Sequence, residues 1–226
     1  MSNFIAHRGL NSKKYSENTK EAILDSLKYN YIKGIEIDVR MTKDKKIVVI
    51  HDSTINRTSN GSGFVKNMTL RELRKYNFGT DKNPSKISTL NEILNLIPNN
   101  KLILIELKSD KKQDTNIFIR RFYNIIRKYK NKNIYIASFN EKLIKKLKAP
   151  DSSLKCSVFI SKIINSEHID DTYDFTIVSS YGINTTKNYK KPIFIWAIYN
   201  KKQYLDLTST MDKDVLYIVD YPCKFL

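Results

Sequence analysis

The chain has 226 residues, of which 41% are hydrophobic and 11% aromatic. This composition is typical of a globular protein and excludes a disordered or fibrous one. No apolar run approaches the roughly 18 to 20 residues that span a bilayer, so we expect no transmembrane segment. No secretion signal is visible, and Cys156 and Cys223 match neither a zinc spacing nor a disulfide framework. We therefore interpret both cysteines as buried thiols and expect a cytoplasmic protein.

The formal net charge is +17, from 40 Lys+Arg against 23 Asp+Glu. Such an excess attracts anions, which include nucleic acids, acidic membranes and phosphorylated small molecules. Most of the basic residues are lysines that are spread along the chain, without the interleaved aromatic residues of a nucleic-acid groove. We therefore expect no specific nucleic-acid partner and only a weak attraction to membrane surfaces.

The first predicted strand covers residues 3–6 and ends in His7, Arg8 and Gly9. A helix follows, with Asn18 as its N-cap and Glu21 as the capping-box partner. Two short strands follow. The first carries Glu36 and Asp38, and the second covers residues 47–50. A loop-rich stretch from 53 to 88 comes next, in which residues 69–77 carry a short helix.

Beyond this stretch the chain alternates regularly between strand and helix. We expect strands over 102–108, 133–138, 154–160, 174–180, 192–198 and 215–220, and helices over 89–97, 114–130, 140–148, near 162–170 and over 201–211. Such alternation predicts a parallel sheet with crossover helices, and at this length an α/β (β/α)8 TIM barrel. No linker is visible, so we expect a single domain over 1–226 with a small insertion at about 53–88.

Nine candidate strands compete for the eight positions of the barrel. The connection from Asp38 to Ile47 is too short for a crossover helix. Either an extended segment replaces one helix, or residues 47–50 pair outside the barrel proper. The sequence leaves both arrangements open.

Glu36 and Asp38 are two residues apart in a predicted strand, so their side chains lie on one face. Two neighbouring carboxylates repel each other unless a cation lies between them, which indicates a metal site. The alternative is a half-exposed strand whose polar face is formed by Glu36, Asp38 and Arg40. Glu106 and Lys108 repeat the same arrangement at the end of a later strand.

The metal-site interpretation is favoured because polar side chains recur at the ends of strands. In a TIM barrel the catalytic residues lie at the carboxyl-terminal ends of the strands, on one face. At or just beyond such ends the sequence places His7, Glu36, Asp38, His51, Glu106, Lys108, Trp196 and Asp220. The third histidine, His168, is expected on the surface.

The residue types indicate the chemistry. Glu36, Asp38 and Glu106 offer only hard oxygen ligands, which favours Mg²⁺ or Ca²⁺ over zinc. Arg8 and Lys108 add positive charge where a phosphate would gain negative charge. The histidines at 7 and 51 titrate near neutrality and suit acid and base roles, and Glu17 is placed to reach the site from its loop. These parts describe a phosphodiester substrate.

A set of motifs runs in one order along nearly the whole chain: HRG at 7–9, ENT at 17–19, EIDVRMTKD at 36–44, VVIHD at 48–52, NRTSNGSG at 56–63, IELK at 105–108, SF at 138–139 and DYP at 220–222. In this order the motifs resemble those of the glycerophosphodiester phosphodiesterase family. The resemblance implies a TIM barrel that hydrolyses glycerophosphodiesters, which are small molecules, to sn-glycerol 3-phosphate and an alcohol.

The resemblance also implies roles for individual residues. The metal ligands would be Glu36, Asp38 and Glu106, and the catalytic pair His7 and His51. Phosphate would be contacted by Arg8 and Lys108, and residues 53–88 would form the family's small cap. We expect Trp196 to line the pocket against the glycerol, with core packing as the alternative, and Glu17, Asn18 and Asp220 to support the site.

Three departures from the family pattern affect the shape of the pocket. The usual Asp-Gly turn reads Asp44-Lys45, the Trp-Thr-Val-Asn signature reads WAIYN at 196–200, and the final Thr-Asp becomes Val219-Asp220. Two other functions stay open. One is a lyase of the same fold that stops at the cyclic phosphate of a lysophospholipid-type substrate, and the other is a non-catalytic basic barrel that binds anions.

Overall fold

The computed structural model describes residues 3–10, 12–110, 113–161, 172–182, 191–211 and 215–224. The helix expected near 162–170, with His168, and the side chain of Cys223 lie outside the described residues. Cys156 is buried, as expected, and burial raises the pKa of its thiol to about 12. Within the described ranges, no helix combines the length and apolarity needed to cross a bilayer.

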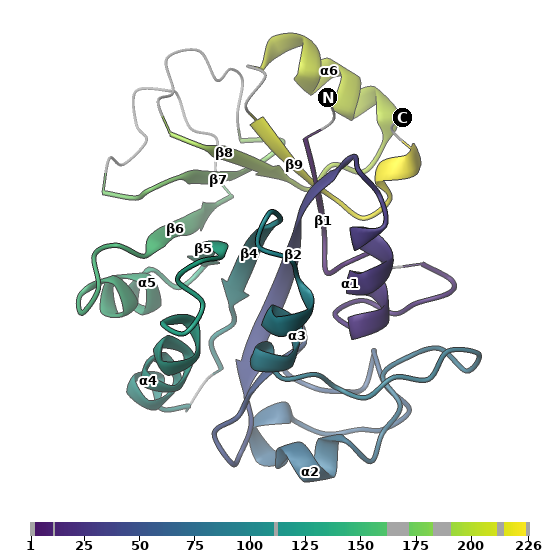
Figure 1. The fold of residues 1–226 in the computed structure, drawn as a ribbon, viewed down its shortest axis with the longest axis vertical. Helices are drawn as coiled ribbons and strands as arrows, with labels where there is room; N and C mark the ends of the chain where they lie inside the picture. Colours follow the sequence, from purple (N-terminus) through teal and green to yellow (C-terminus); the bar gives the residue numbers. More distant parts are fainter. Residues whose placement is uncertain are drawn as a thin grey trace.

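Eight parallel strands close into a barrel (Figure 1). Around the barrel they follow the order β1, β9, β8, β7, β6, β5, β4 and β2, and β2 pairs with β1. Their bounds are β1 Phe4–Ala6, β2 Ile32–Met41, β4 Leu102–Leu107, β5 Asn133–Ser138, β6 Lys155–Ile160, β7 Thr176–Ser179, β8 Ile193–Trp196 and β9 Val215–Val219. The predicted (β/α)8 barrel is confirmed.

The ninth strand, β3 (Ile47–Val49), pairs antiparallel with β2 and takes no place in the barrel wall. The turn between the two strands, residues 42–46, is too short for a crossover, so the chain has to double back. Of the two arrangements that the sequence leaves open, the structure therefore has the one in which residues 47–50 pair outside the barrel.

The described helices are α1 Lys20–Leu27, α2 Leu70–Leu73, α3 Leu90–Leu96, α4 Thr115–Ile126, α5 Glu141–Lys148 and α6 Lys201–Thr210, with 3₁₀ turns η1 Val65–Asn67 and η3 Pro222–Lys224. Helix α4 ends before residue 130, where the expected helix ended, because the residues after Ile126 are mostly charged and offer little apolar surface to bury.

The expected N-cap of α1 is wrong by one residue. Thr19 caps the helix and accepts a hydrogen bond from the Ala22 amide, whereas Asn18 adopts a left-handed conformation with φ of 57°. Glu21 makes no capping box with Asn18, and its carboxylate instead accepts a hydrogen bond from the Ser85 hydroxyl at 2.6 Å. The Asn18 side chain is thereby free to reach the barrel interior.

Alternation along the strands divides the core into an outer and an inner layer. In β4, Ile103, Ile105 and Leu107 pack outward with the helices, while Leu102 and Leu104 join the aromatic and aliphatic cluster inside the barrel. Glu106 shares the inward face of Leu104 at the carboxyl end of the strand. The inward positions are therefore apolar lower in the barrel and polar at its mouth.

The stretch from 53 to 88 builds a small apolar cluster of its own on β3, formed by Val48, Ile50, Ile55, Val65, Leu73, Phe78 and Ile87. It carries η1 and α2 and extends to one side of the barrel (Figure 1). Capping boxes at Thr69 and Thr89 start α2 and α3. This cluster gives the loop-rich stretch a fixed shape next to the strand that precedes His51.

Candidate functional site

The turn after β1 places His7 and Arg8 at the mouth of the barrel. Arg8 and Gly9 both have positive φ, 56° and 74°. A Cβ at Gly9 would come within 2.9 Å of backbone atoms of Ala22 and Ile23, so only glycine fits this turn without displacing α1. The tight turn lets the Arg8 amide donate a hydrogen bond to Glu36 Oε2 at 3.0 Å.

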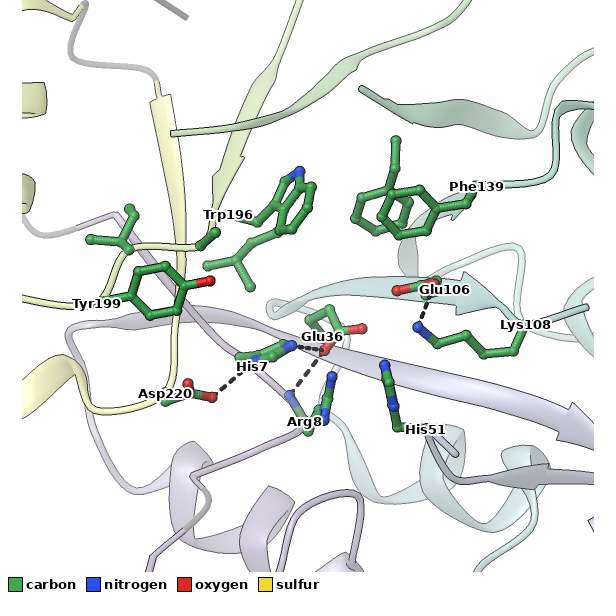
Figure 2. Close-up of a pocket in the computed structure, with 14 residues that line it drawn as sticks. His7, Arg8, Glu36, His51, Glu106, Lys108, Phe139, Trp196, Tyr199 and Asp220 are labelled. Atoms are coloured by element: carbon green, nitrogen blue, oxygen red, sulfur yellow. Dashed lines mark hydrogen bonds and ion pairs between the residues drawn. The ribbon is translucent and has the colours of Figure 1, made fainter. Parts of the chain in front are cut away.

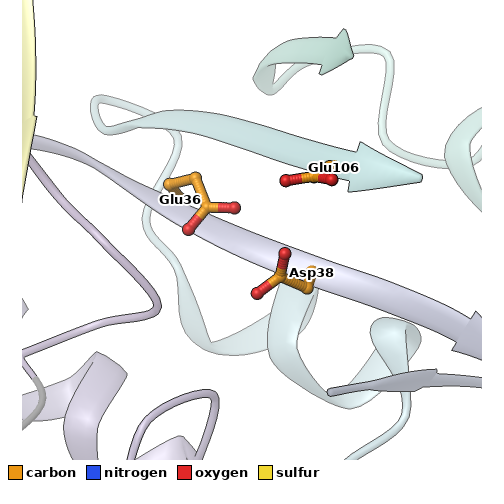
Figure 3. A group of neighbouring side chains, drawn as sticks. All are labelled: Glu36, Asp38 and Glu106. Atoms are coloured by element: carbon orange, nitrogen blue, oxygen red, sulfur yellow. The ribbon is translucent and has the colours of Figure 1, made fainter. Parts of the chain in front are cut away.

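Three carboxylates gather on β2 and β4 (Figure 3). Parallel pairing sets Asp38 of β2 directly beside Glu106 of β4, and Glu36 lies two residues earlier on the same face as Asp38. One carboxylate oxygen of each lies within 4.8 Å of the others, and all three residues are buried. The alternative of a half-exposed strand is wrong, because even Arg40 is only 8% exposed.

The buried acids hold different charges. Burial raises the pKa of Glu36 to about 8 and that of Glu106 to about 7, and the negative charge of Asp38 adds to both shifts. Burial also opposes ionisation of Asp38, but the positive charges of Lys108 and Arg8 outweigh it and lower its pKa. Asp38 is therefore the carboxylate that stays ionised in the absence of another cation.

Asp38 is held from two sides. The Asn18 amide nitrogen donates to Asp38 Oδ2 at 2.9 Å, and the Asp38 amide donates to Asn18 Oδ1 at 3.2 Å. Lys108 Nζ lies 3.1 Å from Asp38 Oδ1 and 2.5 Å from Glu106 Oε1. Asp38 Oδ1 nevertheless accepts no hydrogen bond from the described residues. Lys108 forms an ion pair with this oxygen, but the angles between the two groups do not meet those of a hydrogen bond.

His7 stands between two carboxylates. Its Nδ1 bonds to Asp220 Oδ1 at 2.7 Å, and its Nε2 lies 3.9 Å from Glu36 Oε2. Burial by itself lowers the pKa of His7, but the bond to Asp220 and the charge of Glu36 outweigh burial and raise it. His7 is therefore the more readily protonated imidazole of the pair.

His51 follows β3 and faces the same pocket from the other side (Figure 2). Its Nδ1 bonds to Asp52 Oδ1 at 2.7 Å, and its carbonyl accepts a hydrogen bond from Arg40 Nε at 2.8 Å. Burial lowers the pKa of His51, and the charge of Asp38 and the bond to Asp52 do not fully offset it. His51 therefore loses its proton more readily than His7.

The pocket between these groups measures about 230 Å³ and has two contrasting halves (Figure 2). The histidines, Arg8, Lys108 and the acids line one half. Aromatic rings line the other, where Phe139 and Phe159 stack with centroids 4.5 Å apart and Trp196 meets both edge-on. Trp196 lines the pocket and also packs on the apolar interior of the barrel. Its contact with the glycerol stays a prediction.

The structure brings every sequence-predicted site residue to this mouth. Glu17 bonds to Arg8 Nη1 at 2.9 Å, and Asp220 reaches His7 as described. Sequence reasoning did not assign roles to Asp52, Arg57, Phe139, Phe159 and Tyr199. Four of these lie inside quoted motifs, namely VVIHD, NRTSNGSG, SF and WAIYN, so the sequence carried a signal for them but did not show which side chains face the pocket.

A divalent cation fits the donor set. Three buried carboxylates converge, burial and the charge of Asp38 raise the pKa values of the other two, and an oxygen of Asp38 lacks a hydrogen bond in the described part of the chain. All three side chains offer hard carboxylate oxygens, the ligand type that hard divalent cations prefer. The acidic cluster is therefore a candidate site for a hard divalent metal.

A closed parallel barrel of this kind is a TIM barrel. Its acids and histidines lie at the carboxyl ends of the strands, where TIM-barrel enzymes have their active sites. A sequence model of one family of such barrels, the glycerophosphoryl diester phosphodiesterase family, matches residues 7–196. The chain belongs to this family, and the resemblance seen in the motifs is confirmed.

Relatives agree with this assignment. The chain is 38% identical over 157 residues to a glycerophosphodiester phosphodiesterase of Caldanaerobacter subterraneus subsp. tengcongensis, a match that covers 67% of this chain and 63% of that protein. It is 30% identical over 154 residues to the human glycerophosphodiester phosphodiesterase 1, covering 65% of this chain and 45% of the human protein. The matched part thus spans about half to less than two thirds of these relatives' own length.

Solved structures share the fold. An Oleispira antarctica phosphodiesterase, determined in complex with the product sn-glycerol-3-phosphate, superposes with a TM-score of 0.87 at 22% identity. The alignment covers 100% of this chain and 95% of that one. The glycerophosphodiester phosphodiesterase of Thermotoga maritima gives a TM-score of 0.75 at the same identity, covering 100% and 99%.

Proposed function

We propose that the protein hydrolyses glycerophosphodiesters to sn-glycerol 3-phosphate and an alcohol. The observation that carries the proposal is the arrangement of two histidines with opposite pKa shifts on either side of a buried acidic cluster. Family membership supports the substrate class. The aromatic half of the pocket gives the organic part of the substrate an apolar surface, and the cationic half suits the phosphate.

We assign the metal to Glu36, Asp38 and Glu106, and a hard cation, Mg²⁺ or Ca²⁺, to the site. When bound, such an ion neutralises charge on the phosphoryl group and acidifies a hydroxyl. Arg8 and Lys108 are placed to contact the phosphate oxygens. Positive charge at this position stabilises the negative charge that gathers on the phosphate oxygens in the transition state.

The histidines divide the proton transfers. His51, whose pKa is lowered, takes the proton of the glycerol 2-hydroxyl, whose oxygen attacks phosphorus. His7, whose pKa the bond to Asp220 helps to raise, gives a proton to the oxygen of the leaving alcohol. Water then opens the cyclic phosphate, with the two proton transfers reversed. Asp52 and Asp220 each bind the Nδ1 side, which leaves Nε2 of both rings for the substrate.

The test is release of sn-glycerol 3-phosphate from a panel of glycerophosphodiesters with choline, ethanolamine or glycerol head groups. Wild-type protein is assayed with EDTA, then with Mg²⁺, then with Ca²⁺. We expect turnover that requires metal and is lost in Glu36→Ala. His7→Ala and His51→Ala should each lose about 10² to 10⁴-fold in turnover, the usual contribution of an acid or base.

Phosphorus NMR of the product separates hydrolysis from cyclisation. An accumulating cyclic phosphate would replace the proposed hydrolase with the lyase alternative. A folded wild-type protein that turns over no substrate with either ion would leave an anion-binding barrel as the better description.

A further inference from the structure

Arg57 lies in the 53–88 stretch and contacts no carboxylate of the acidic cluster, yet it joins both sides of the site. Its Nε and Nη2 donate to the two oxygens of Asp52 at 2.7 and 2.9 Å. Its Nη1 and Nη2 donate to the two oxygens of Glu17, both at 2.7 Å. One guanidinium thus makes two bidentate pairs, which use four of its five N–H groups.

On one side the chain of bonds continues to a histidine. Asp52 Oδ1, which accepts from Arg57, also accepts from Nδ1 of His51 at 2.7 Å. A carboxylate held by two guanidinium nitrogens cannot rotate freely. Its oxygen therefore presents a fixed acceptor to His51, which favours the tautomer that carries its proton on Nδ1.

On the other side the chain of bonds continues to a phosphate-binding candidate. Glu17 Oε1 accepts from Arg57 and from Arg8 Nη1, and Arg8 Nε lies 3.2 Å from Asp38 Oδ2. Arg8 therefore keeps its contact with Asp38 and its own bond to Glu17 whether or not Arg57 is present. His51 has no such second tether through its ring.

Charge supports the same picture. The Arg57 hydrogen bonds come first among the causes that lower the pKa of Asp52, so Asp52 stays ionised and does not take the proton from the imidazole. Replacing Arg57 would leave Asp52 and Glu17 without their shared cation. The two anions would then repel across the position that it occupied.

We propose that Arg57 is a positioning residue for the reaction: through Asp52 it fixes the orientation and tautomer of His51, and through Glu17 it ties the 53–88 stretch to the turn after β1. The inference rests on the proposed function for its effect on turnover. Its structural half, the tautomer of His51, stands without any assumption about the substrate.

The experiment compares wild type, Arg57→Ala and Arg57→Lys by steady-state kinetics and by ¹H–¹⁵N NMR of the imidazoles. The chain has three histidines, so their signals can be assigned one by one. We expect Arg57→Ala to lower kcat by about 10 to 100-fold, as loss of a partner that orients an active group does, with little change in KM. Arg57→Lys should recover only part of the lost kcat, because an ammonium cannot make two bidentate pairs.

In the NMR spectrum, wild-type His51 should show the tautomer protonated on Nδ1. In Arg57→Ala its nitrogen shifts should move toward a mixture of tautomers, while those of His7 stay in place. Arg74→Ala is the matched control, since Arg74 lies in the same 53–88 stretch, donates from Nη2 to both oxygens of Glu92 and does not line the pocket. It should leave kcat and the His51 signals unchanged.

Unchanged His51 signals in Arg57→Ala would overturn the proposal, whatever happens to turnover. A rise in KM with unchanged kcat in Arg57→Ala would also overturn the proposal, since Arg57 would then contact the substrate rather than orient His51. Should wild type be inactive on every substrate, the proposed function fails, and the NMR comparison still decides the role of Arg57. Should Arg57→Ala not fold, Arg57→Lys carries both measurements.

Discussion

At the scale of residues, one motif occurs twice with opposite outcomes. His7 and His51 each donate through Nδ1 to a carboxylate at 2.7 Å. Burial opposes the charged form of both rings. The bond to Asp220 and the charge of Glu36 outweigh burial and raise the pKa of His7, whereas burial together with the charges of Lys108 and Arg8 outweighs Asp38 and Asp52 and lowers the pKa of His51. The opposite shifts therefore come from the balance of all the charges around each ring rather than from the shared bond at Nδ1.

The acidic cluster makes metal binding depend on pH. With pKa values of about 8 and about 7, Glu36 is mostly protonated and Glu106 about half protonated at pH 7 in the metal-free protein. A cation must displace these protons, so affinity should rise from pH 6 to about pH 9 and then level off. Calorimetry in two buffers of different ionisation enthalpy should report about one proton or more released per ion at pH 7.

The same shifts predict the stability of the metal-free protein. Both pKa values are raised on folding, so the folded state binds more protons than the unfolded state between about pH 4.5 and pH 8. The free energy of unfolding should therefore fall as pH rises through this range.

An affinity for metal that does not change between pH 6 and pH 9 would contradict the assignment of these carboxylates.

At the scale of elements, a buried ion pair joins β2 to the segment after β4. Arg40 Nη1 bonds to Asp110 Oδ1 at 2.7 Å, both side chains are at most 10% exposed, and Arg40 also holds the carbonyl of His51. The pair thus connects three segments that carry site residues. A buried charge left without its partner is costly, whereas removal of both charges is tolerated better.

We therefore expect Arg40→Leu to lower the free energy of unfolding by roughly 3 to 5 kcal/mol. The double variant Arg40→Leu/Asp110→Leu should lose less than the single one, because it leaves no uncompensated carboxylate. Urea unfolding of the two variants and wild type gives the comparison. Equal losses in the single and double variants would show that the contact with the His51 carbonyl, rather than the ion pair, dominates.

Periodicity predicted most of these elements, because strand and helix patterns are local. The sequence does not decide the position of β3, since an apolar run such as IVVI looks the same beside a parallel or an antiparallel neighbour. The pattern also does not separate Asn18 from Thr19 as the N-cap of α1, because both residue types cap helices. What decides between them is Asp38, twenty residues away, which takes up the Asn18 amide. Arg57 was missed for a similar reason: its partner Glu17 is forty residues distant.

At the scale of the whole molecule, the charge of +17 coexists with a small, specific site. Much of the acidic complement is engaged in pairs at the mouth, including Glu17, Asp38 and Asp52. The excess of positive charge therefore belongs to the lysines spread over the rest of the chain. Such a distribution gives a long-range attraction to anions without a shaped binding surface.

We accordingly expect association with vesicles of anionic lipid that depends strongly on salt. Binding should be seen by sedimentation at about 0.01 M salt, where the Debye length is about 30 Å, and be absent at about 1 M, where it is about 3 Å. Vesicles of neutral lipid serve as the control. Binding that persists at high salt would point instead to insertion of apolar side chains.

Because β3 lies outside the closed wall of the barrel, the residues of the site differ in how stably they are held. The three carboxylates lie on barrel strands, whereas His51 and Asp52 follow β3. A barrel strand pairs with another strand on both edges, whereas β3 pairs with β2 on one edge and has only the Ser88 carbonyl and an isolated bridge to Thr89 on the other, so we expect β3 to open more readily than the barrel. Such an opening would withdraw His51 and Asp52 and leave Glu36, Asp38 and Glu106 in place. Amide hydrogen exchange should then be faster at Val49 and Ile50 than in β4. Such a difference would mean that the three carboxylates stay in place while His51 moves away from the pocket.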